Sequence, residues 1–115
     1  MSSVLLAEDE FLIRAVLVDA LGDVGIACIE APTGQAALDV VTGTAPLSAI
    51  IVDIGLPDMS GEKVIEAAAR HRPGTPIIRC SGAGGGPATP GVHVFPKPYS
   101  ATELSKFVAS LIARG

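Results

Sequence analysis

Short apolar runs recur along the chain and are separated by longer segments with a different periodicity. Five runs consist mainly of Val, Ile, Leu and Ala, at residues 4–7, 26–29, 49–52, 76–80 and 92–95. A strand buried on both faces carries a continuous apolar run, whereas a half-buried strand alternates. The pattern therefore predicts five short strands in a sheet that is covered on both faces.

Segments with helical spacing follow four of these runs. In the first segment, apolar residues recur at intervals of three and four, at Ile13, Val16, Leu17, Ala20 and Leu21. The other three segments open with residues that commonly cap helices, Thr33, Ser60 and Ser100. Glu103 stands three residues after Ser100 and completes the pattern of a capping box. Helices are therefore predicted after the first, second, third and fifth strands.

The order of these elements predicts the fold. Strands and helices alternate at least three times, which is typical of a parallel sheet with helices on both faces. Right-handed crossovers then favour a doubly wound α/β fold of the flavodoxin-like type, with five parallel strands in the order 2-1-3-4-5. The whole chain, residues 1–115, is predicted to form this one domain. In such sheets, ligands bind at the carboxyl ends of the strands.

The amino-acid composition limits the possible binding partners and indicates the cellular compartment. The chain has 115 residues, with 12 acidic and 8 basic side chains, a formal net charge of -4 and no Trp. An acidic chain with few aromatic residues argues against direct binding of nucleic acid or of an anionic membrane. Cys28 and Cys80 lie far apart in apolar runs, and we expect neither a signal peptide nor a membrane-spanning segment. Buried thiols in a cytoplasmic protein are therefore expected.

The polar residues that could carry out chemistry follow the ends of the predicted strands. Residues 8–10, all acidic, follow the first strand, Asp53 follows the third, Ser81 the fourth and Lys97 the fifth. Carboxylates brought together at one edge of a sheet repel each other unless a cation lies among them, and Mg²⁺ accepts such oxygen ligands. With Mg²⁺ and Lys97 offsetting the charge, Asp53 could attack a phosphoryl group, and Ser81 could donate a hydrogen bond to it. The pattern thus predicts formation of an aspartyl phosphate.

Four motifs resemble the receiver domain of two-component response regulators. They are Ala-Glu-Asp-Glu at 7–10, Val-Asp-Ile-Gly-Leu-Pro-Asp-Met-Ser-Gly at 52–61, Cys-Ser-Gly at 80–82 and Phe-Pro-Lys-Pro at 95–98. The resemblance covers essentially the whole chain and points to a stand-alone type with a degenerate fourth helix. It implies that Asp53 accepts a phosphoryl group from a histidine kinase or a histidine phosphotransfer protein.

The same resemblance implies roles for the other site residues. Glu8, Asp9 and Asp53 would be metal ligands, together with the backbone carbonyl of Gly55. The side chains of Ser81 and Lys97 would contact the phosphoryl group. The bond between Lys97 and Pro98 would be cis, a form that only an X-Pro bond adopts at low cost.

Two features depart from the family pattern. Receiver domains usually carry a helix between the fourth and fifth strands, but residues 82–91 are rich in Gly and Pro, so we predict a loop or at most one helical turn. The usual aromatic switch position, three residues before Lys97, is Val94. We therefore expect switching through an order-disorder change in residues 82–91. Without a covering helix, Arg79 and His93 are expected to meet solvent.

These observations predict a phosphoacceptor module, a monomer or weak dimer, that signals through a downstream protein or serves as a phosphate sink. Beyond phosphorylation of its own Asp53 and slow autodephosphorylation, we expect no enzymatic activity. An alternative is a Mg²⁺-dependent phosphohydrolase with an aspartate nucleophile, but its second acid would stand where Gly55 is. A flavodoxin-like cofactor carrier is a further alternative, although three acids after the first strand would repel a flavin phosphate.

Overall fold

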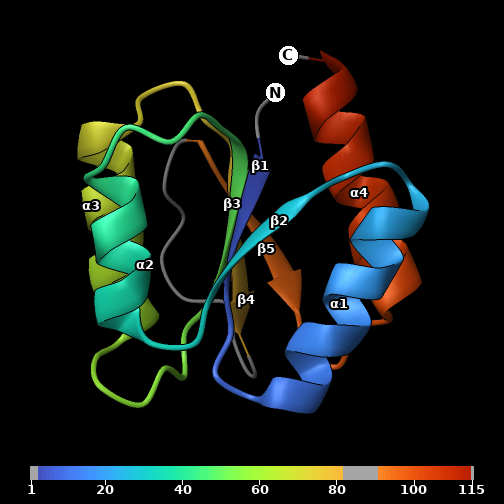
Figure 1. Cartoon of the computed structure of the whole chain (residues 1–115), viewed down its shortest axis with the longest axis horizontal. Coiled ribbons are helices and arrows are strands. Elements are labelled where there is room, and N and C mark those ends of the chain that lie inside the picture. Colours follow the sequence, from blue (N-terminus) through green and yellow to red (C-terminus); the bar gives the residue numbers. More distant parts are fainter. Residues whose placement is uncertain (1–2, 82–90, 115) are drawn as a thin grey trace.

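Five parallel strands form the centre of the molecule, and helices cover both faces of the sheet (Figure 1). The computed structural model describes residues 3–81 and 91–114. In chain order the elements are β1 (Ser3–Ala7), α1 (Phe11–Asp23), β2 (Cys28–Ala31), α2 (Gly34–Val41), β3 (Leu47–Asp53), α3 (Gly61–His71), β4 (Ile77–Ser81), β5 (Val92–Pro96) and α4 (Ala101–Arg114). The strand order β2-β1-β3-β4-β5 confirms the predicted fold class.

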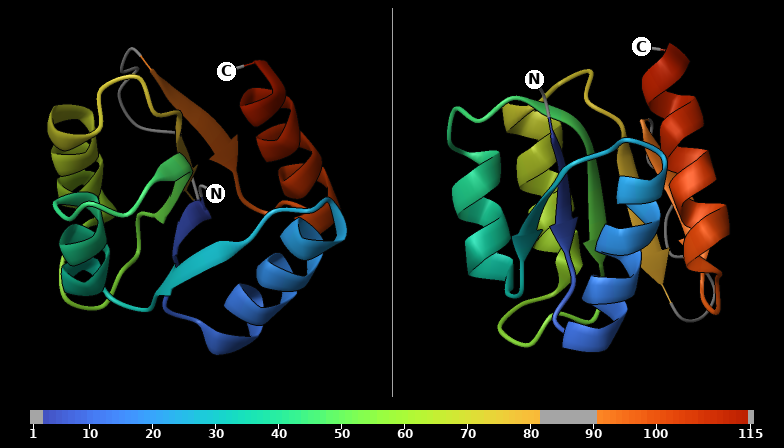
Figure 2. Two further views of the ribbon diagram at one scale, coloured as in Figure 1. Left: turned by 45° about the horizontal axis from the view of Figure 1, so that its top comes forward. Right: turned by 45° about the vertical axis from the view of Figure 1, so that its right-hand side comes forward.

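The sheet separates two apolar cores, because successive residues of a strand point to opposite faces. Ile50 and Val52 of β3 pack toward α2 and α3, whereas Ala49 and Ile51 pack toward α1 and α4. Figure 2 shows these two helix pairs on opposite sides of the strands. Burial on both faces explains the continuous apolar runs. None of the helices among residues 3–81 and 91–114 is long and apolar enough to cross a membrane.

The second strand begins two residues later than its apolar run indicates. It spans Cys28–Ala31 rather than 26–29. Ile26 instead closes the end of α1, where its amide donates to the carbonyl of Leu21 at 2.9 Å after a turn at Gly25 with φ 81°. Its side chain packs into the core beside α1. The apolar run therefore marked burial and not strand structure.

Arg79 is buried, so the prediction that it meets solvent is wrong. Only 5% of Arg79 is exposed. Its side chain lies on the same face as α3 and forms an ion pair with Glu62 in the first turn of that helix. The carboxylate of Glu62 offsets part of the desolvation of the guanidinium. His93 retains partial exposure, but on the other face, where its ring contacts Phe107 edge-on with centroids 5.6 Å apart.

The remaining expectations concern the two cysteines, the switch position and the segment after β4. Cys80 is buried as expected, while Cys28 is half-buried, and both are free thiols. Val94 is exposed on β5. The predicted loop and its switching role fall almost wholly on residues 82–90, which lie outside the described residues.

Helix α2 has only 8 residues, and both of its ends are held by side chains from outside the helix. Asp58, in the β3–α3 loop, accepts hydrogen bonds from the amides of Gly34 and Gln35 at 2.7 and 2.9 Å. These bonds, the one from Gly34 most strongly, lower the pKa of Asp58. Arg72, just after α3, donates to four carbonyl oxygens of residues 40–45 at 2.6 to 3.0 Å. An anion at the start of α2 and a cation at its end both suit the helix dipole.

Helix α3 starts directly against the backbone of β3. The amide of Gly61 donates to the carbonyl of Ile54 at 3.0 Å. A Cβ on Gly61 would lie 2.5 Å from the carbonyl oxygen of Asp53 and 2.8 Å from the Cα of Ile54. Only glycine fits this close approach, which fixes the helix behind the end of β3.

Replacement of Gly61 by Ala should therefore destabilise the protein, because backbone atoms cannot yield as a flexible side chain would. We expect Gly61→Ala to lower the free energy of unfolding by about 1 to 3 kcal/mol. The matched control is Gly22→Ala in α1, where an added Cβ meets nothing within 4 Å. That variant should be neutral or more stable by up to about 1 kcal/mol. Urea unfolding measures both, and equal effects would contradict the steric argument.

Candidate functional site

Five of the predicted site residues meet at the carboxyl edge of the sheet. Glu8 and Asp9 follow β1, Asp53 ends β3, Ser81 ends β4, and Lys97 follows β5. Parallel strands all end at the same edge, which brings together residues that lie far apart in the chain. The convergence predicted from the sequence is confirmed.

The acidic residues of this edge could hold a metal ion. One carboxylate oxygen from each of Glu8, Asp9 and Asp53 lies within 4.8 Å of the others. Glu8 and Asp53 are 2% and 6% exposed. Buried carboxylates at this separation repel one another, and a divalent cation among them would remove that cost. The all-oxygen donor set fits Mg²⁺.

Lys97 places a positive charge beside the carboxylates of the site. Its Nζ lies 2.9 Å from Oδ1 of Asp53. Burial alone would lower the pKa of Lys97, but the hydrogen bond and the charge of Asp53 outweigh it and raise this pKa. The amide of Lys97 donates to the carbonyl of Ser81 at 2.8 Å, and the bond to Pro98 is cis, as predicted. The segment after β5 is thus anchored to the end of β4.

The environment of Glu8 strongly raises the pKa of its carboxyl group. Burial raises its pKa from 4.5 to about 7, and the charge of Asp53 and a hydrogen bond with it add to the increase. The amide of Glu10, which donates to Oε2 of Glu8 at 3.1 Å, and the charge of Lys97 act in the opposite direction. The metal-free site therefore holds a proton on this carboxyl group at neutral pH part of the time.

Ser81 presents a hydroxyl group without a hydrogen-bond partner among the described residues, although its Oγ is buried. Buried hydroxyl groups are usually paired, so an unpaired one at a site is available to a ligand. Asp53 accepts a further hydrogen bond at Oδ1, from the amide of Gly55 at 3.2 Å. The role of the Gly55 carbonyl as a metal ligand stays a prediction.

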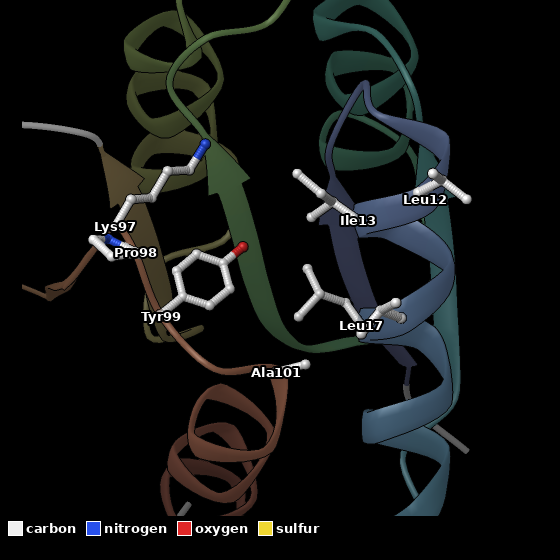
Figure 3. Close-up of a pocket in the computed structure, with 8 residues that line it drawn as sticks. Leu12, Ile13, Leu17, Lys97, Pro98, Tyr99 and Ala101 are labelled. Carbon is white, nitrogen blue, oxygen red and sulfur yellow. The ribbon is translucent and has the colours of Figure 1, made fainter.

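A groove with apolar walls borders the site, and the sequence alone did not indicate it. A cavity of about 610 Å³ separates α1 from the segment after β5, and its lining residues are Leu12, Ile13, Val16, Leu17, Lys97, Pro98, Tyr99 and Ala101. Figure 3 shows Ile13 and Leu17 of α1 opposite Tyr99, with the Lys97 amine near the end of β3. Desolvation by burial raises the pKa of Tyr99.

Exposure along α1 corrects the helical pattern read from the sequence. Val16, assigned above to the apolar face, is 56% exposed, and Leu12 is 75% exposed. The signal missed was that apolar residues occupy more of α1 than one core-facing stripe requires. A second omission was Arg14, whose side chain contacts the loop that carries Glu8 and Asp9.

Comparison with known proteins gives consistent matches. The family model described as the response regulator receiver domain matches residues 4–108. The transcriptional regulatory protein PmrA of Pectobacterium parmentieri is 32% identical over 120 residues, which covers 96% of this chain. The chain spans 52% of the length of that relative.

Solved structures share the fold. A response regulator receiver protein from Sinorhizobium medicae superposes with a TM-score of 0.87 at 23% identity, covering 97% of this chain and 94% of the other. A CheY-like receiver domain protein from Methanospirillum hungatei gives a TM-score of 0.84 at 22% identity, covering 99% and 95%. At these identities the likeness concerns the fold.

The raised pKa of Glu8 gives a testable dependence of stability on pH in metal-free protein. Below pH 4.5 the carboxyl is protonated in both the folded and the unfolded chain. Between pH 4.5 and about 7 only the unfolded chain releases the proton, so this group makes folding less favourable as pH rises. Glu8→Gln removes the effect and should gain about 1 to 3 kcal/mol over wild type across that window.

Urea unfolding at pH 4.5, 6 and 7.5 with a chelator present measures this difference. Glu66→Gln, at an exposed position of α3, is the matched substitution measured beside it. A Glu8→Gln difference that does not grow between pH 4.5 and 7.5 would refute the assigned pKa.

Proposed function

The chain belongs to the response regulator receiver domain family of two-component signalling, and on this premise we propose that Asp53 is its phosphoacceptor. The donor would be a phosphohistidine on a histidine kinase or a histidine phosphotransfer protein. The observation that carries the proposal is the ion pair of 2.9 Å between Asp53 and Lys97 inside a cluster of three carboxylates. The pair keeps a nucleophilic carboxylate beside a fixed cation.

The transfer would exchange one bond to phosphorus for another. A carboxylate oxygen of Asp53 forms the new P–O bond while the P–N bond to the donor histidine breaks. Lys97 Nζ, which contacts Oδ1, would offset negative charge on the phosphoryl oxygens. The Ser81 hydroxyl, which has no hydrogen-bond partner among residues 3–81 and 91–114, would donate to one of them. Mg²⁺ held by Glu8, Asp9, Asp53 and the Gly55 carbonyl would supply the remaining positive charge.

We propose that the aspartyl phosphate is a signal and not an intermediate of turnover. A phosphohydrolase of the same chemistry needs a general acid and base two residues after the nucleophile, and Gly55 has no side chain there. Autodephosphorylation would accordingly be slow. The module would act in the cytoplasm, as a monomer or weak dimer, by contact with a downstream protein or as a phosphate sink.

We propose that the phosphodonor partner binds in the groove beside α1. Its rim exposes Leu12 and Val16, and its inner end reaches Lys97. Exposed apolar surface of this kind marks contacts with other proteins. A partner seated there would deliver its phosphohistidine to the adjacent Asp53.

Phosphorylation of Asp53 can be tested with Mg²⁺ and acetyl phosphate. Mass spectrometry of the intact protein should show one adduct per chain that hydroxylamine removes. Asp53→Asn should abolish the adduct, and Ser81→Ala should slow its formation by roughly 100-fold through loss of one hydrogen-bond donor. Asp19→Asn, at an exposed acid of α1, should react as wild type. A full adduct on Asp53→Asn would reject the proposal.

Docking in the groove is tested by comparing two phosphodonors. Val16→Asp should reduce transfer from a phosphorylated histidine phosphotransfer partner by more than about 10-fold, because it places a charge on the apolar surface that the partner would cover. Its reaction with acetyl phosphate should be unchanged, since that donor needs no groove. The matched control is Val24→Asp, an exposed valine that does not line the groove. Equal loss in both variants, or loss with both donors, would contradict docking here.

A further inference from the structure

Helix α1 begins with a charge arrangement that its own dipole disfavours. Arg14 is the fourth residue of the helix, close to the end where the dipole is positive. The first turn contains no acidic residue, and the N-cap residue Glu10 makes no side-chain cap hydrogen bond. A cation at this position therefore needs compensating contacts.

The contacts of Arg14 lead to the acidic loop. Nη1 donates to the carbonyl oxygens of Glu8 at 3.0 Å and Asp9 at 3.4 Å. Nε donates to Oε1 of Glu30 on β2 at 3.0 Å, and the guanidinium lies 5.7 Å from the centroid of the Phe11 ring. The side chain is largely buried by these neighbours. One guanidinium thus joins the β1–α1 loop to the adjacent strand.

We propose that Arg14 is a positioning residue for the metal site, an inference that rests on the proposed function. The connection between β1 and α1 has only three residues, Glu8, Asp9 and Glu10. Arg14 fixes the carbonyls of the first two, and the Glu8 carboxylate is itself tied to the amide of Glu10 at 3.1 Å. Little torsional freedom remains, so the acidic pair is held ready for a cation before one arrives.

Glu30 completes the arrangement by orienting the guanidinium. It occupies the Nε side of the fork and leaves Nη1 for the two carbonyls. A lysine has a single ammonium on a flexible stem and cannot span both groups with fixed geometry. The contact set therefore requires arginine in particular, and not only a positive charge.

The proposal is tested by titrating the protein with MgCl₂ in isothermal calorimetry, without any phosphodonor. Arg14→Ala should bind Mg²⁺ about 10-fold more weakly, the usual cost of losing a residue that supports metal ligands. Arg14→Lys should restore only part of the affinity. Arg70→Ala, which removes an exposed arginine from the last turn of α3, is the control and should match wild type.

Phosphorylation by acetyl phosphate provides the second measurement. The rate for Arg14→Ala should be low at limiting Mg²⁺ and return to nearly the wild-type value at saturating Mg²⁺, because Asp53, Ser81 and Lys97 are intact. Unchanged Mg²⁺ affinity, or a defect that persists at saturation, overturns the proposal. If Arg14→Ala does not fold by circular dichroism, Arg14→Lys decides by the same criteria.

The wild-type protein separates this proposal from the function on which it rests. Failure of wild type to bind Mg²⁺ or to be phosphorylated would reject the proposed function. Normal binding and phosphorylation of wild type, with equal affinity in the Arg14 variants, would reject only the role of Arg14.

Discussion

The site depends on one electrostatic constraint, the burial of two carboxyl groups, Glu8 and Asp53, at the end of a parallel sheet. Burial and mutual repulsion both oppose the presence of two charges there. The compensation comes from a distant part of the chain, because Lys97 reaches Asp53 from the segment after β5. In a parallel sheet every strand ends at the same edge, which brings this cation to the two carboxyl groups. The charge balance of the site therefore depends directly on the strand arrangement of the fold.

Close packing between backbone atoms also holds the carboxyl ends of β3 and β4 in place. Gly61 sets α3 against the carbonyl of Asp53, and the amide of Lys97 binds the carbonyl of Ser81. These contacts involve main-chain atoms, which have few alternative positions. The side chains of the proposed site thus extend from closely packed backbone, an arrangement that suits electrostatic stabilisation of a bound group.

The sequence predicted the features that depend on periodicity and on motif order. The five strands, the caps at Thr33 and Ser60, and the convergence of the site followed from local patterns. Whether an individual side chain is buried was harder to predict. Arg79 was misjudged because its partner, Glu62, is brought to it by tertiary packing alone. Val16 and Ile26 were misassigned because an apolar side chain can serve a partner surface or a helix end as well as a core.

Helix α2 owes its ends to residues outside itself, and this has a consequence for cooperativity. Eight residues are too few for a stable isolated helix in water. Asp58 and Arg72, which close the two ends of α2, flank α3 in the chain. Because these contacts connect the two helices, we expect α2 and α3 to open together in native-state hydrogen exchange. Displacement of the loop between Asp53 and α3 would break the hydrogen bonds that the amides of Gly34 and Gln35 donate to Asp58. Hydrogen exchange at these two amides would therefore report movement at the carboxyl edge of the sheet.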